Sequence, residues 1–331
     1  MEGVGPLTAL LVWGVVHAQE DTELRWQAAG QVDSAPFGVV DLGVRRGTWS
    51  AELLTDTLDL RWSPEGDKGR AWVALRGELG AAALMMGPWT SGAPAPEQGF
   101  GASYLGGEAG ILGYGRHGLY AGLAGHARRV SFRELPVTEV ALPAPSPWLL
   151  ADVVAGLYRP QGHIWVRAGV QHDALGDSVQ PHVHATATAT PDFGERLGAV
   201  VELRAGTARG QSILTRTRVG GMNPYVVPIA GAGWGEWWAE SYAIGRLGPR
   251  LTWDKGDHTV QHRLVVDGGL ADDLTASAAS DAALLWGVGS LNRWARQRWF
   301  GELDVGWGAG LSRGEGVLPV SVWFAVGRSW G

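Results

Sequence analysis

The feature that most constrains this chain is the alternation of apolar and polar residues at a period of two. It is clearest in the closing segment 318–331, LPVSVWFAVGRSWG, where every second residue from Leu318 to Val326 is aliphatic or aromatic. The positions between them hold Ser, Trp, Ala and Gly, and Trp330 follows. Such alternation predicts a β-strand with two different faces. A final strand with one apolar face and a terminal aromatic residue is typical of a transmembrane β-barrel, although a soluble sandwich can also end this way.

Strand-like runs of the same kind recur along the chain. In 297–311, for example, Leu303 and Val305 alternate with Glu302 and Asp304. Charged residues that recur opposite aliphatic ones indicate a polar lumen and a lipid-facing exterior. We therefore predict an all-β fold over residues 37–331, a transmembrane antiparallel β-barrel of about 14 strands with a range of 12–16. The predicted strands are 37–46, 48–62, 69–86, 100–114, 117–132, 147–158, 162–172, 182–190, 197–207, 236–253, 257–270, 282–293, 297–311 and 317–328.

The lengths of the connections provide an independent test, because outer-membrane barrels have long loops on one side and short turns on the other. Long connections and short turns alternate along this chain, which a soluble sandwich does not require. Both termini then lie on the side of the short turns. The long segments are 87–99, 133–146, 173–181, 208–235 and 271–281, and short turns occupy 115–116, 159–162, 254–256 and 294–296.

Composition agrees with a membrane barrel. The 331 residues include 18 Trp, a residue that settles at the membrane–water interface, and 51 Gly, which suit curved strands and turns. No segment after the N-terminus approaches the ~20 apolar residues of a membrane helix. The absence of Cys excludes disulfides and Cys-ligated metals, and the net charge of −6 without a basic stripe makes nucleic acid an unexpected partner.

The N-terminal residues suggest export. Pro6 to Val16 form a short apolar core, and Ala18 ends a small-residue site, so we interpret 1–18 as a signal peptide. Residues 19–36 are a periplasmic lead or an extra strand. The expected location is the outer membrane of a Gram-negative bacterium. The expected partners are outer-membrane lipid, BAM-type assembly machinery during insertion, and an unidentified protein partner.

The C-terminal third, roughly 216–331, resembles the surface-antigen barrels, the family of the central BAM-complex subunit and the two-partner secretion transporters. The ending from Phe324 to Trp330 resembles the closing strand of that family, and the segment 263–269, RLVVDGG, resembles its strand that ends in aliphatics, Asp and Gly. The resemblance implies a closing strand and a long loop folded back into the lumen. The residues implicated are, for the lumen loop, Gly220, Gly221, Met222, Pro224, Tyr225, Pro228 and Gly231, and for the closing strand, Phe324, Val326, Gly327, Arg328 and Trp330.

The chain also departs from this family. The family anchors its long loop with an Arg-Gly pair, whereas this sequence has Ala230 before Gly231. Family barrels have sixteen strands, and there is no room before residue 37 for periplasmic substrate-binding domains. A barrel-only relative is therefore expected, acting as a porin-like pore or transport barrel or in membrane assembly. The alternatives are a structural or partner-binding barrel and an outer-membrane hydrolase.

Few residues suggest catalysis or metal binding. His182 and His184 share one strand face, a spacing compatible with a metal, but a site needs a third ligand. His172 and Ser178 lie in a predicted loop, a poor arrangement for a nucleophile and its base. We therefore predict no catalytic residue, metal or cofactor, and interpret these side chains as polar lumen or rim residues.

Overall fold

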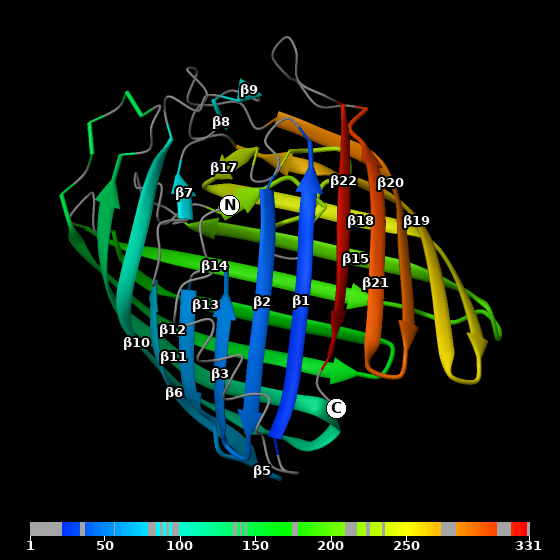
Figure 1. Cartoon of the computed structure of the whole chain (residues 1–331), viewed down its shortest axis with the longest axis horizontal. Helices are drawn as coiled ribbons and strands as arrows, with labels where there is room; N and C mark the ends of the chain where they lie inside the picture. Colours follow the sequence, from blue (N-terminus) through cyan, green and yellow to red (C-terminus); the bar gives the residue numbers. More distant parts are fainter. Residues whose placement is uncertain are drawn as a thin grey trace.

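The computed structural model describes residues 22–33, 37–55, 57–78, 84–86, 89–90, 93–94, 99–134, 138–139, 141–142, 144–173, 178–208, 217–222, 226–233, 236–272, 283–309 and 319–329. Figure 1 shows that the strands curve into a barrel. Its wall consists of β1 (Thr22–Val32), β2 (Phe37–Arg46), β3 (Trp49–Leu54), β4 (Thr57–Trp62), β6 (Gly69–Glu78), β10 (Phe100–Tyr114), β11 (Leu119–Arg133), β12 (Ser146–Arg159), β13 (Gly162–Asp173), β14 (Ser178–Ala189), β15 (Leu197–Ala208), β18 (Ser241–Lys255), β19 (His258–Ala271), β20 (Ala283–Arg296), β21 (Trp299–Trp307) and β22 (Val320–Arg328).

These sixteen strands form a closed antiparallel sheet. Each wall strand pairs with the next in the chain, and β1 pairs with β22 over the register from Trp26↔Arg328 to Val32↔Val322, which closes the ring. Short strands accompany the wall: β5 (Glu65–Gly66), β7 (Leu84–Met86), β8 (Trp89–Thr90), β9 (Ala93–Pro94), β16 (Thr217–Val219) and β17 (Trp237–Ala239). Closure matters because a membrane leaves no solvent for an unpaired sheet edge.

The all-β barrel is confirmed, but the predicted count of about 14 strands is two too low. The predicted run 48–62 is in fact two strands, β3 and β4, separated by a turn in which Thr55 has a φ of 56°. The outward-facing apolar positions change from odd numbers in β3 (Trp49) to even numbers in β4 (Leu60 and Trp62), a change of phase that the single predicted run did not take into account. The second extra strand is β1, which places residues 22–32 in the barrel wall. The other shifts are small: the run 236–253 divides into β17 and β18, and the segment 173–181 shrinks to a connection of four residues, 174–177.

The two sides of the barrel differ as the loop lengths predict. Short turns join β2 to β3, β12 to β13, β18 to β19 and β20 to β21, whereas the connections after β6, β11, β15, β19 and β21 are long. Strand β1 starts and β22 ends on the side of the short turns. In an outer-membrane barrel the short turns face the periplasm.

The two faces of the wall have the predicted polarity. On β21, Leu303 is 53% exposed on the outside, and on β19 the carboxylate-bearing Asp267 is fully buried on the inside. Exposed tryptophans lie toward both ends of the outer surface, with Trp286 and Trp307 near the long loops and Trp294 and Trp299 near the short turns. An apolar band between two aromatic girdles is the surface that a lipid bilayer requires.

No helix among the described residues is long and apolar enough to span a membrane.

Candidate functional site

The long connection between β15 and β18 folds into the barrel. We call its described residues, 217–222, 226–233 and 236–240, the lumen loop. Within it β16 pairs with β17, and a bridge joins Gly221 to Ile229, whose amide donates to the Gly221 carbonyl at 3.1 Å. These internal bonds satisfy backbone groups that would otherwise be buried without partners.

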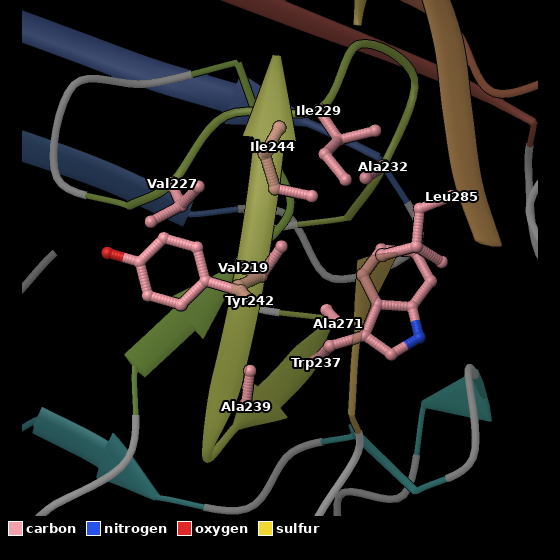
Figure 2. Packing of buried hydrophobic residues seen from close by; sticks show 10 residues of the cluster. All are labelled: Val219, Val227, Ile229, Ala232, Trp237, Ala239, Tyr242, Ile244, Ala271 and Leu285. Atoms are coloured by element: carbon pink, nitrogen blue, oxygen red, sulfur yellow. The ribbon is translucent and has the colours of Figure 1, made fainter. Parts of the chain in front are cut away.

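The apolar residues of the lumen loop pack against one side of the barrel wall. Figure 2 shows Trp237 beside Leu285 of β20, and Ile229 close to Ile244 of β18. Ile229 and Leu285 are both fully buried. The cluster consists of Val219, Val227, Ile229, Ala232, Trp237, Ala239, Tyr242, Ile244, Ala271 and Leu285. Burial of this many apolar side chains gives the loop a fixed seat on the wall.

The next residue, Trp238, packs against the opposite side. It is 2% exposed and clusters with Phe100 of β10 and Val130 of β11, while the Arg218 guanidinium lies 4.5 Å from the centre of its ring. Strand β10 is the sixth wall strand and β20 the fourteenth of sixteen, so they lie half a circumference apart. Two neighbouring tryptophans therefore connect opposite walls, and the lumen loop spans the interior.

Asp267 on β19 holds the loop by a polar contact. Its carboxylate accepts two hydrogen bonds from the Arg246 guanidinium of β18, at 2.6 and 2.8 Å, and a third from the backbone N–H of Ala230 at 2.8 Å. Asp267 is fully buried, so all three donors are needed to offset the loss of hydration. The arginine of this anchor belongs to the wall and not to the loop.

Glycines on β20 and β21 allow the loop to approach the wall backbone. A Cβ added to Gly287 would lie 2.0 Å from the Ala230 carbonyl oxygen, and one added to Gly306 would lie 2.3 Å from the Gly231 nitrogen. Gly231 itself has a φ of +78° and would carry its Cβ 1.9 Å from the Gly308 nitrogen. No L-residue fits at these contacts without moving the backbone.

A second polar contact comes from β1. Gln31 is 1% exposed, its carbonyl oxygen accepts from the Met222 N–H at 3.0 Å, and its amide donates to the Ala232 carbonyl at 3.3 Å and to Asp33. Because β1 and β22 close the barrel, this residue ties the loop to the closing strand pair.

A polar cavity of about 360 Å³ lies against the loop. Its lining combines guanidinium, carboxylate and aromatic side chains: Gln27, Arg204, Met222, Pro228, Arg246, Arg263, Leu291, Asn292, Arg293, Phe300, Glu302, Asp304 and Trp323. Arg204 donates to Glu202, and Arg293 lies 3.6 Å from Glu302, so charges of both signs are present.

The structure places most residues that the family resemblance implicated. Of the lumen-loop residues, Gly220, Gly221, Met222, Pro228 and Gly231 are buried, whereas Pro224 and Tyr225 lie outside the described residues. In the closing strand, Phe324 and Val326 face outward and Gly327 is buried. In the sheet register, Arg328 is paired with Trp26 on β1 and with Trp299 on β21. Trp330 lies outside the described residues.

The histidine pair His182 and His184 lies on the inner face, with ring centres 5.7 Å apart. Asp152 bonds the His182 Nε2 across the middle strand β13, where Gly169 leaves room, since a Cβ there would lie 2.4 Å from the carboxylate. Arg167 bonds the same carboxylate. Among the described residues, no group of three or more His, Cys, Asp or Glu could hold a metal ion.

Three contacts of the site were not anticipated from the sequence: Arg246 and Gln31 as partners of the loop, and Trp238 as its contact with the far wall. Alternation alone can assign Arg246 to one face of its strand, but it cannot pair that residue with a specific carboxylate. For Trp238 the signal was an apolar Trp-Trp pair at the end of a long loop.

The closed sixteen-strand wall, the apolar band and the inward loop define a class: an outer-membrane β-barrel with an occupied lumen. No protein-family profile matches the sequence, and no curated protein sequence matches it. Solved structures match the fold. CdiB from Escherichia coli superposes with a TM-score of 0.63 at 9% identity, covering 94% of this chain and 63% of that protein.

Two further structures give similar values. CdiB from Acinetobacter baumannii has a TM-score of 0.60 at 11% identity over 94% of this chain and 60% of its own. BamA from Haemophilus ducreyi, in a form lacking POTRA domains 1–3, has a TM-score of 0.60 at 10% identity. The match covers 94% of this chain and 70% of the BamA chain. The chain thus spans about 60% of the length of the CdiB proteins. The surface-antigen type of barrel is confirmed at the level of the fold.

Proposed function

We propose that this protein is an outer-membrane transport barrel whose passage is closed by the lumen loop and opened when the loop leaves its seat. The observation that carries the proposal is the contact of Trp237 and Trp238 with opposite walls, because a segment anchored on both sides obstructs the route between them. The polar cavity of about 360 Å³ and the charged inner wall support a water-filled path on the other side of the obstruction.

The loop is held by contacts that can be released without unfolding the barrel. Its anchors are the Asp267 carboxylate, the Gln31 amide and apolar packing, whereas the barrel ring itself closes through β1 and β22. A sixteen-strand barrel is wide enough to leave an aqueous channel when nothing fills it. Gating by an internal loop therefore requires rearrangement of the loop alone.

Deleting residues 222–231 tests the proposal. The deletion removes Met222, the Asp267-bound amide of Ala230 and the close contact of Gly231, so single-channel conductance in planar bilayers should rise severalfold. Mobility differences between unheated and boiled gel samples serve as the check that the barrel is folded. A folded variant with unchanged conductance would refute the proposal and favour the alternative of a partner-binding barrel, for which a pull-down from native membranes is the direct assay.

A further inference from the structure

Most of the charged side chains that line the cavity beside the lumen loop are neutralised by a partner. The arginines and carboxylates of its lining include Arg204, Arg246, Arg263, Arg293, Glu302 and Asp304. Three of these arginines have a carboxylate partner, in the pairs Arg204–Glu202, Arg246–Asp267 and Arg293–Glu302. Arg263 and Asp304 form no ion pair with any described residue. Within the described part of its lining, the cavity therefore presents an unmatched cation and an unmatched carboxylate.

Both unmatched side chains are held in place by uncharged neighbours. The Arg263 Nε donates to the Gln261 Oε1 at 2.6 Å, which leaves the two terminal guanidinium nitrogens without a partner among the described residues. The Asp304 Oδ1 accepts from the Asn292 backbone N–H at 2.9 Å, and no described donor bonds its Oδ2. A partly buried charge without a partner is costly. Two such charges of opposite sign in one cavity indicate a ligand that matches both.

The strand register keeps these two charges apart. Arg263 is paired with Leu291 on β20, and Leu291 is paired in turn with Asp304 on β21, so all three share the inner face. Two strand spacings, roughly 10 Å, separate the backbones of Arg263 and Asp304. Leu291 lies between them and is 7% exposed. The carboxylate and the ammonium of an α-amino acid are attached to one carbon atom, so a single small ligand bridges such a gap.

The uncharged part of the cavity lining is largely apolar, and the cavity has the size of a small-molecule site. Met222, Leu291, Phe300 and Trp323 contribute thioether, aliphatic and aromatic surface. The volume of about 360 Å³ lies at the lower end of the range of ligand pockets. Phe300 is the second residue of β21, beside a short turn, whereas Met222 belongs to the lumen loop. The cavity therefore extends from the loop toward the periplasmic side of the barrel.

We propose that this cavity binds an α-amino acid with an apolar side chain, as its zwitterion, from the periplasmic side. The Arg263 guanidinium donates to the ligand carboxylate, the Asp304 carboxylate accepts from the ligand ammonium, and the apolar side chain packs against Leu291 and Phe300. A simple anion would meet the unmatched Asp304, and a simple cation would meet the unmatched Arg263, so the site selects a ligand with both charges. As the solute of the transport barrel this ligand rests on the proposed function, although binding itself requires no movement of the loop.

Equilibrium binding of radiolabelled L-leucine to the intact barrel, folded in detergent, tests the site. Unlabelled isocaproate, which lacks the ammonium, and isoamylamine, which lacks the carboxylate, serve as competitors with the same apolar side chain. We expect saturable binding of one leucine per barrel. Each analogue should compete about tenfold more weakly than unlabelled leucine, the effect of one lost charge-assisted hydrogen bond.

Asp304→Asn removes the carboxylate but keeps an oxygen that accepts from the Asn292 N–H. Leucine should bind about tenfold more weakly to this variant, and isocaproate should then compete as well as leucine, because the ammonium has lost its partner. The matched control is Asp59→Asn on β4, since Asp59 is bonded by Arg76 and lies outside the cavity lining. It should bind leucine as the unmodified protein does, and heat-modifiable gel mobility verifies the fold of each variant.

Absence of saturable leucine binding to the unmodified barrel would overturn the proposal. Competition by either analogue as strong as that by leucine would also overturn it, because a single charge would then be sufficient, and so would unchanged leucine binding to Asp304→Asn. The gating test remains separate from this one. Leucine binding together with unchanged conductance after deletion of residues 222–231 would retain the site and refute the gating, whereas raised conductance without leucine binding would retain the gating and refute the site.

Discussion

Asp267 is the residue on which the seat of the lumen loop depends most. It is fully buried and shared by the wall strand β18, through Arg246, and by the loop, through the Ala230 N–H. The resemblance to the surface-antigen barrels implied an arginine as the anchor of the loop, and the sequence has Ala230 at the comparable position. In this structure the guanidinium comes from the wall strand β18, and the loop contributes only a backbone donor.

Replacing Arg246 with Met should therefore destabilise the protein by about 3–5 kcal/mol, because Asp267 would remain buried with one donor. The free energy of unfolding in denaturant measures this. The double variant Arg246→Met with Ala230→Arg restores a guanidinium from the loop side and should recover part of the loss. A single variant as stable as the unmodified protein would mean that Asp267 has no anchoring role.

Among the strands, β20 and β21 are specialised for holding the loop. Their inward-facing glycines form a flat surface on which the loop backbone lies, with Gly287 and Gly306 closest to it. Other glycines in the same hairpin have no such contact: a Cβ at Gly301 would meet its nearest atom at 3.9 Å. The glycine content of this hairpin therefore has two origins, close packing on the inside and ordinary strand curvature elsewhere.

Gly287→Ala should displace the loop, because the added methyl would lie 2.0 Å from the Ala230 carbonyl. We expect a destabilisation of about 1–3 kcal/mol, as for overpacked cores, together with raised conductance. Gly301→Ala in the same hairpin is the control and should change neither property. Equal melting temperatures and conductances for the two variants would contradict the proposed seat.

The barrel as a unit is defined by its two solvents, lipid outside and water inside. Leu303 lies midway along β21 between Trp299 and Trp307 and faces lipid, whereas Gln27 on β1 lines the inner cavity and pairs across the sheet with Asp41. The same substitution at these two positions therefore meets opposite environments.

Leu303→Arg should cost ~2–4 kcal/mol of folding free energy, because a guanidinium near the bilayer midplane loses its hydration. Gln27→Arg should cost much less, since water and the Asp41 carboxylate are within reach. Reversible unfolding in lipid vesicles measures both. Similar costs at the two positions would mean that the inside and outside of the wall have been exchanged.

Much of the architecture could be predicted because period-two alternation is local. Each strand must present one face to lipid and one to water, so residues such as Leu303 and Asp304 reveal their directions without reference to any partner. Loop length is also read directly along the chain, and it correctly gave the side on which the short turns lie and on which β1 starts and β22 ends. The count of strands was too low at Thr55, where a tight turn shifts the phase of the alternation inside one predicted run, and at 22–32, which the sequence left open as a periplasmic lead or an extra strand and which forms β1.

The contacts of the candidate site depended on tertiary structure alone. Arg246 and Asp267 meet because two strands align in one register, and Trp237 and Trp238 separate to opposite walls because the ring closes between β1 and β22. His262 and Asn292 likewise meet on the outer surface because the register of β19 and β20 places them opposite each other. Alternation determines which way a side chain points, but only strand register and closure of the ring determine what it meets there.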